Sequence, residues 1–264
     1  MTELFVDPEI AERIDRIEIP WGRSGVDPYG VDRVTLARFM SALKWFYKGY
    51  FRVRVTGSEH IPSRGRGMLI GNHSGGIAID GAMVLASCLL ELEPPRLAQG
   101  MAEKFIEHTP FGGTIAAKCG QFTGLPENAL RLLRDERLLM VFPEGARGTA
   151  KLFHQRDSLV DFGTGFVRLA LQTGAPIIPF GVVGAGDAMP TVYNAYKLGR
   201  AFGVPYLPVT PWLLPVPVPA QISIHYGEPM IFKGTGREDD EVVQGYVDEV
   251  KQRVAELIES GRPL

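Results

Sequence analysis

The chain has 264 residues, of which 45% are hydrophobic and 22% charged, and its formal net charge is −2. This composition is typical of a globular fold with an ample core, and the charge gives no reason to expect nucleic-acid binding. No stretch approaches the run of about 18 uncharged apolar residues that marks a membrane span. The acidic N-terminus also lacks the basic start and apolar core of a signal peptide.

Residues 1–32 are charged and rich in turn residues, and we expect them to form an N-terminal arm on the main domain, residues 33–264. Residues 33–50 predict an amphipathic helix whose charged side chains are all basic. Such a helix, with Trp45 beside Lys44, suits the interface of an anionic membrane. The alternative is an ordinary surface helix with a solvated basic face. The basic residues are Arg33, Arg38, Lys44 and Lys48.

A short apolar run at residues 68–70 predicts a buried strand that leads directly to Asn72 and His73. A glycine-rich turn follows, and Asp80 then stands at the head of a helix predicted over residues 82–90. Open α/β sheets carry their sites beyond the carboxyl ends of the strands. We therefore interpret His73 as a base and Asp80 as the carboxylate that orients it. The alternative is a turn histidine, with Asp80 as the helix N-cap.

The spacing of His73 and Asp80 limits how the two side chains can meet. A continuous helix would separate residues seven apart by roughly 10 Å, too far for a hydrogen bond. The pair meets only if Ser74-Gly75-Gly76 folds back on itself, and the two glycines supply the backbone freedom for such a turn. The glycines therefore favour an interacting pair.

A second buried strand is predicted at residues 138–142, and it runs into Pro143-Glu144-Gly145-Ala146-Arg147. Charged residues at the end of an apolar strand have no packing role there, so Glu144 and Arg147 are site candidates. A plain turn with a local ion pair is the alternative. Helices at 126–137 and 162–173 alternate with these strands and with a third strand at 176–183. This order predicts a single α/β domain with a mainly parallel central sheet flanked by helices.

Residues 205–219 contain six prolines and no charged residue. Proline at this density excludes a regular helix and a central strand. An uncharged apolar loop is either buried or forms an exposed patch, and with a basic helix elsewhere in the chain it favours a lipid-facing rim or an acyl channel. Cys88 and Cys119 have no CxxC partner, so we expect structural thiols in a reducing compartment.

With these motifs the chain resembles the glycerolipid acyltransferase superfamily, the lysophosphatidic acid acyltransferase-like enzymes. The resemblance covers most of residues 50–232. Its first block is Asn72-His73 with Asp80, and its most specific block, about seventy residues later, is Phe142-Pro143-Glu144-Gly145-Ala146-Arg147. Two weaker blocks follow: Gly165-Phe166 leading to Ala175-Pro176-Ile177-Ile178-Pro179, and Gly227-Glu228-Pro229.

Two departures from the family pattern bear on the substrate. The family usually has four residues between the histidine and the aspartate, whereas this chain has six. The second family block usually ends in an arginine that holds the acceptor phosphate, whereas residues 120–127 contain none. In this respect the chain resembles the branch that includes monoacylglycerol and diacylglycerol acyltransferase-like proteins.

The resemblance implies an acyltransferase that moves a fatty acyl chain from acyl-CoA or acyl-carrier protein to a hydroxyl of a lysophospholipid such as 1-acylglycerol-3-phosphate. His73 would be the general base and Asp80 its orienting acid. The family needs neither a metal nor a cofactor beyond the acyl donor. The residues it implies for substrate binding are Asn72, Glu144, Gly145 and Arg147, with Lys118 as a weaker stand-in for the absent arginine, or else an ordinary solvated lysine.

Two other functions stay open at this point. The same transfer could use a neutral mono- or diacylglycerol acceptor, or the chain could be a non-catalytic lipid-binding, membrane-associated protein. A lipid hydrolase is a weaker fit, because the sequence shows no Gly-x-Ser-x-Gly nucleophile motif. In each case we expect a cytoplasmic protein that is peripheral on the inner face of a membrane.

Overall fold

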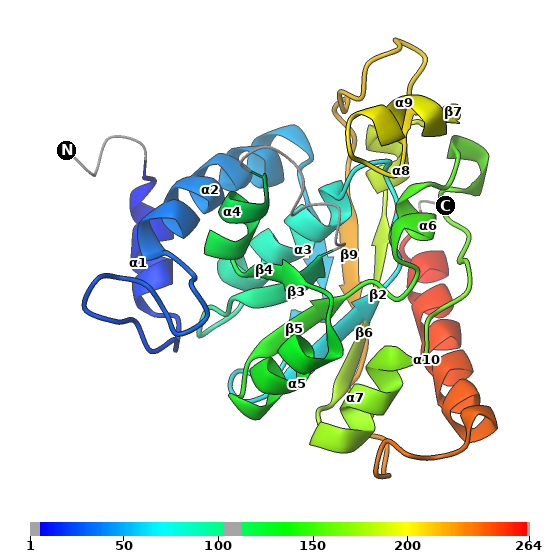
Figure 1. Cartoon of the computed structure of the whole chain (residues 1–264). Helices are drawn as coiled ribbons and strands as arrows, with labels where there is room; N and C mark the ends of the chain where they lie inside the picture. The colour runs from blue at the N-terminus through cyan, green and yellow to red at the C-terminus, as the bar shows by residue number, and fades with distance from the viewer. Residues whose placement is uncertain (1–5, 103–111, 263–264) are drawn as a thin grey trace.

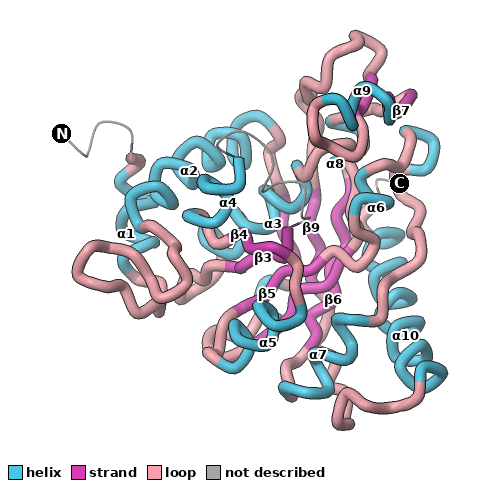
Figure 2. Tube along the Cα trace, viewed as in Figure 1, coloured by secondary structure: helices cyan, strands magenta, loops and turns pink. Residues whose placement is uncertain are grey.

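The structure, a computed structural model, describes residues 6–102 and 112–262. Its centre is a seven-stranded sheet in the order β1-β9-β6-β2-β5-β3-β4, with helices on both faces (Figures 1 and 2). Five adjacent strands of this sheet are mutually parallel, and only β9 and β1 at one side run in the opposite direction. The predicted α/β domain with a mainly parallel sheet is therefore confirmed.

Three of the strands, β2, β5 and β6, lie within a few residues of the runs predicted at 68–70, 138–142 and 176–183, whereas β3 and β4 were not predicted as strands. The parallel strands are β2 (Gly67–Gly71), β3 (Ala98–Ala102), β4 (Gln121–Thr123), β5 (Leu138–Val141) and β6 (Ile177–Val183). The remaining two are β1 (Arg54–Thr56) and β9 (Ser223–Tyr226).

The core has two halves, one on each face of the sheet, because successive side chains of a strand point to opposite faces. In β2, Leu69 packs into one half, and Met68 and Ile70 pack into the other. The helices of the first half are α1 (Pro8–Asp15), α2 (Arg33–Trp45) and α3 (Ile79–Leu90). Those of the second half are α5 (Pro126–Arg134), α7 (Gly165–Thr173) and α10 (Asp240–Ser260).

Between β6 and β9 the chain leaves the sheet and forms a small lobe at the top of Figure 1. Its two strands, β7 and β8, pair only with each other, an edge arrangement that the proline-rich sequence tolerates. The sequence pattern did not predict that these residues form a separate lobe. Its elements are α8 (Ala185–Ala188), β7 (Tyr193–Ala195), α9 (Tyr196–Ala201) and β8 (Leu207–Val209).

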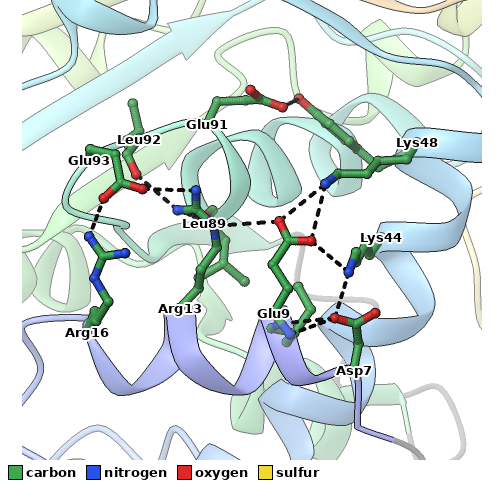
Figure 3. Close-up of polar contacts among 12 residues, drawn as sticks. Asp7, Glu9, Arg13, Arg16, Lys44, Lys48, Leu89, Glu91, Leu92 and Glu93 are labelled. Atoms are coloured by element: carbon green, nitrogen blue, oxygen red, sulfur yellow. Dashed lines mark hydrogen bonds and ion pairs between the residues drawn. The ribbon is translucent and has the colours of Figure 1, made fainter.

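The predicted basic helix exists as α2, continued by a π-helical turn at Phe46–Tyr50, but its basic face is not free. The Lys44 Nζ lies 2.6 Å from an Asp7 oxygen and 2.8 Å from a Glu9 oxygen (Figure 3). Glu9 also accepts from Lys48 at 3.2 Å. The sequence showed no acid within the helix, but the carboxylates come from the N-terminal arm that packs beside it.

The apolar side of α2 is buried in the core through Leu36, Met40 and Leu43. Trp45 and Phe46, at its C-terminal end, are exposed. Within the described residues, no helix combines the length and the apolar character needed to cross a membrane.

The contact between α1 and α2 should depend on pH. The hydrogen bonds from Lys44 hold the pKa values of Asp7 and Glu9 below their ordinary values of 3.8 and 4.5. Their contribution to stability is therefore present above those ordinary values and is lost as the pH falls through the lowered ones. We expect Lys44→Met to lower the free energy of unfolding at pH 7 by up to about 1 kcal/mol, and to change it little in strong acid.

Urea unfolding of both proteins at the two pH values measures this difference. Lys48→Met is the matched control. Lys48 is half exposed, and among the described residues it forms an ion pair only with Glu9. An equal effect of Lys44→Met at both pH values would contradict the assignment.

Candidate active site

His73 follows the end of β2 and contacts Asp80, seven residues later. The ring Nδ1 lies 2.8 Å from one Asp80 oxygen and 3.0 Å from the other. Asp80 is in the first turn of α3, which begins at Ile79 rather than at residue 82 as predicted. The Asp80 side chain therefore does not cap the helix, and the six intervening residues keep the pair in contact.

The turn between the two residues depends on Gly75 and Gly76, which have φ angles of +86° and +67°. L-residues rarely adopt this left-handed region. A Cβ at Gly75 would lie 2.9 Å from the carbonyl oxygen of Ala185, and one at Gly76 would lie 2.9 Å from the Thr191 hydroxyl. Both the backbone conformation and the space require glycine, as the sequence predicted for a turn that folds back.

The Asp80 carboxylate is fully buried and accepts three N–H groups. Besides the imidazole, the donors are the backbone N–H of Ser74 at 2.6 Å and that of Gly81 at 2.7 Å. These bonds, with the N-terminus of α3, compensate for the burial of the carboxylate. Because a carboxylate only accepts, Nδ1 of His73 carries the ring proton and Nε2 is the basic nitrogen.

Glu144 holds the backbone of His73 from the other side. Its carboxylate is buried and accepts the N–H of His73 at 2.7 Å, the N–H of Val160 at 2.8 Å and the Lys151 ammonium at 3.0 Å. Lys151 is buried too, and it also donates to the carbonyl of Ser158 at 2.7 Å. The Glu144 carboxylate thus fixes the backbone of His73.

Asn72 has a similar framework role. Its side-chain amide donates to the carbonyl of Val182 at 2.9 Å and accepts the N–H of the same residue at 2.7 Å. This pair of bonds ties the end of β2 to β6. Asn72 and Glu144, which the resemblance implied for substrate binding, both point into the protein and fix the strand ends around His73.

A cavity of about 450 Å³ lies beside the imidazole. Phe142 stacks on the His73 ring with 4.1 Å between centroids and forms part of the wall. Gly145 lines the cavity as well, just before the short helix α6 (Ala146–Thr149). Among the described residues that line it, none is Asp, Glu, Lys or Arg. The cavity is therefore an apolar chamber with an imidazole in its wall.

The two expected cationic substrate ligands lie outside this chamber. Arg147 is exposed, and its guanidinium donates to the carbonyl of Asp161 at 3.0 Å. Its neighbours Ala146 and Thr149 line the cavity, but Arg147 itself does not. Lys118 is exposed at the end of α4 (Gly112–Lys118). Neither cation contacts His73 or Glu144 among the interactions of the described residues.

Tyr206 lines the cavity, but the sequence did not indicate it as a site residue. It lies directly before β8 in the lobe, far from His73 along the chain. Its hydroxyl contacts the Thr149 hydroxyl and donates to the carbonyl of Gly76 at 3.1 Å. Burial raises the pKa of Tyr206 to about 12, so the phenol is neutral at physiological pH. Tyr206 thus links the lobe to both the glycine turn and α6.

The arrangement supplies a positioned base in a cavity whose described lining residues are largely apolar and include no Asp, Glu, Lys or Arg. Such a base can take a proton from a hydroxyl group of a ligand whose hydrocarbon part fills the chamber. In the part of the chain that the structure describes, no group of three or more His, Cys, Asp or Glu side chains is placed to hold a metal ion.

Comparison with known proteins supports an acyl-transfer site. A sequence-family model described as Acyltransferase matches residues 52–183. An uncharacterized protein of Mycobacterium tuberculosis H37Rv is 34% identical over 249 residues, 90% of this chain and 69% of the relative. An uncharacterized protein of Mycobacterium leprae is 34% identical over 245 residues, 88% and 66% of the two chains.

Among solved structures, the chain is similar to the 1-acyl-sn-glycerophosphate acyltransferase PlsC from Thermotoga maritima. The TM-score is 0.57 and the sequence identity 17%, and the match covers 88% of this chain and 84% of that one. At this identity the likeness concerns the fold.

The buried Glu144–Lys151 pair generates a stability prediction. Lys151→Met leaves the Glu144 carboxylate buried without its ammonium partner, and removal of one member of such a pair costs about 3–5 kcal/mol. Arg147→Met, in the same segment but at the surface, should change the free energy of unfolding by less than about 0.5 kcal/mol. Urea denaturation of the three proteins measures both values. Equal stabilities for the two variants would show that the pair does not hold the site.

Proposed function

The chain belongs to the acyltransferase family, and from that premise we propose that it is an O-acyltransferase of lipid acceptors. In this proposal the acyl chain moves from acyl-CoA or acyl-carrier protein to a hydroxyl group of a lysophospholipid, with His73 as the general base. The structural neighbour PlsC is named as a 1-acyl-sn-glycerophosphate acyltransferase, which supports this substrate class.

In the proposed reaction Nε2 of His73 removes the proton of the acceptor hydroxyl as its oxygen attacks the thioester carbonyl. Asp80 holds the ring in the tautomer with Nδ1 protonated and stabilises the imidazolium that forms. The tetrahedral intermediate then collapses, the C–S bond breaks, and the thiolate takes the proton from His73. The products are an ester and a free thiol, so no covalent acyl-enzyme is required.

The observation that carries the proposal is the position of His73 in the cavity wall. Its Nδ1 is bonded to Asp80, and its ring lines a cavity of about 450 Å³ that holds no charged Asp, Glu, Lys or Arg among the described lining residues. Such a chamber suits a hydrocarbon chain next to the reacting carbonyl.

A neutral acceptor is the second candidate, and one specific observation favours it. Among the described residues that line the cavity there is no Lys or Arg, and Arg147 lies outside them, where it is bonded to the Asp161 carbonyl. A phosphate group would therefore need a cation from outside these lining residues, such as Arg147, while a mono- or diacylglycerol would need no such contact.

We expect His73→Ala to lower acyl transfer by about 10²–10⁴-fold, the range typical of a lost general base. Asp80→Asn should cause a loss in the same range, because an amide no longer orients and stabilises the charged ring. The assay follows labelled acyl-CoA into lipid products that are identified by mass. His154→Ala is the matched control, since His154 is exposed in another segment.

Circular dichroism and urea unfolding of each variant separate a catalytic defect from a folding defect. Full activity of a folded His73→Ala protein would remove the proposed mechanism. Absence of product from the native protein with every donor and acceptor tested would instead favour the non-catalytic lipid-binding function.

Arg147 distinguishes the two acceptor classes. If the acceptor is a lysophospholipid, Arg147→Ala should raise KM for 1-acylglycerol-3-phosphate by about 10-fold or more, since a charge-assisted bond contributes about 1.5–3 kcal/mol. It should leave KM for monoacylglycerol unchanged. Lys118→Ala is the comparison variant, because Lys118 is also exposed and does not line the cavity. A native enzyme that prefers monoacylglycerol, with no effect of Arg147→Ala on either acceptor, would select the neutral-acceptor alternative.

A further inference from the structure

The lobe beyond the carboxyl end of β6 exposes an unusual amount of apolar surface. We name residues 190–218 the crest; they comprise β7, α9, β8 and the loop that follows (Figure 1). The described part of the chain has 18 large hydrophobic side chains that are exposed, and nine of them are in the crest. They include Phe202 at 66% and Leu213 at 76% exposure; the others are Val192, Tyr193, Tyr196, Leu198, Trp212, Leu214 and Val216.

Local hydrogen bonds hold these side chains outward. In the loop after β8, the Thr210 hydroxyl donates to the carbonyl of Leu214 at 2.7 Å, and the Trp212 indole donates to the carbonyl of Val216 at 3.0 Å. Leu213 has a φ angle of +67°, a conformation that leucine rarely adopts. An organised loop that presents leucines to solvent is typical of a binding surface.

The charges of the crest have one sign. No Asp or Glu occurs between Asp187 and Glu228, whereas α9 carries Lys197 and Arg200. Both are exposed, and neither forms an ion pair with a residue that the structure describes. By contrast, Lys44 of α2 is paired with Asp7 and Glu9. A surface of aromatic and aliphatic side chains with unpaired cations matches the interface of an anionic bilayer.

The crest also forms part of the cavity wall. Val204, Pro205, Tyr206, Leu207, Pro208 and Pro215 line the cavity beside His73. The exposed crest residues are therefore continuous in the chain with residues of the cavity wall.

From these observations we propose that the crest is the element that inserts into the surface of an anionic lipid bilayer. Phe202, Leu213 and Leu214 enter the acyl boundary, and Lys197 and Arg200 contact the anionic headgroups. The sequence suggested both the basic helix and the loop at 205–219 as lipid-facing elements. This proposal assigns membrane contact to the crest, which contains most of that loop, and not to the basic helix. A soluble acidic partner is a poorer match, because apolar side chains far outnumber the cations. This proposal depends on the exposed side chains of the crest and not on the proposed acyl transfer.

The test is sedimentation of the purified protein with vesicles of phosphatidylcholine and phosphatidylglycerol. The triple variant Phe202→Ser, Leu213→Ser, Leu214→Ser should lower vesicle partitioning at least about 100-fold, because each buried side chain of this size contributes about tenfold or more. The double variant Lys197→Gln, Arg200→Gln should lose about fivefold per charge on these vesicles and little on pure phosphatidylcholine.

Ile231→Ser is the matched control. Ile231 is 70% exposed, but it follows Met230, which pairs with Ile177 at the opposite end of β6. Its loss should leave vesicle binding unchanged. None of the substituted side chains touches the cavity, so acyl transfer to an acceptor dispersed in detergent reports on the proposed function separately.

Fluorescence locates the insertion. In a Trp21→Phe, Trp45→Phe background, vesicles of brominated phospholipid should quench Trp212, the remaining one of the three tryptophans. Vesicle binding by the triple variant at the native level, or no quenching of Trp212 in a bound protein, would overturn the proposal. So would a native dimer that the triple variant converts to a monomer, because the crest would then cover a second copy of the chain.

Discussion

The hydrogen bond between Nδ1 of His73 and the Asp80 carboxylate is the interaction on which the site depends. It forms because two glycines in left-handed conformations reverse the chain between β2 and α3. The buried carboxylate is satisfied by backbone N–H groups as well as by the ring. On the opposite side, Glu144 accepts the backbone N–H of His73 and is itself neutralised by Lys151. The block with His73 and Asp80 and the block with Glu144 thus position the same imidazole from two sides.

Part of this arrangement could be predicted from the sequence. The apolar runs predicted the parallel strands β2, β5 and β6 but not β3 and β4, and the glycines after His73 predicted a turn that brings Asp80 back to the ring. A charged residue at the end of β5 indicated a site, but the sequence does not say which way a side chain points. Glu144 points inward to the backbone of His73, and Arg147 points outward to Asp161. Both roles depend on contacts that the strand pattern does not contain.

The side-chain contacts that were not predicted join residues that the local sequence pattern does not relate. The basic face of α2 looked free because no acid lies within it, yet Asp7 and Glu9 of the N-terminal arm pair with Lys44. Lys151 gave no signal, because it lies in an irregular segment and is recognisable only as the partner of Glu144. Tyr206 completes the cavity from more than a hundred residues beyond His73. Such contacts follow from the packing of the whole domain, and no local periodicity encodes them. The crest residues that line the cavity are a further example of such a long-range contact.

The most direct test of the central claim is nuclear magnetic resonance of the protein labelled with ¹⁵N-histidine. At a pH where the ring is neutral, we expect His73 to be protonated at Nδ1, with this proton shifted strongly downfield by its bond to Asp80. Asp80→Ala should remove the shift, while the other four histidines keep their signals. A His73 ring protonated at Nε2, or one unaffected by the loss of Asp80, would contradict the central claim.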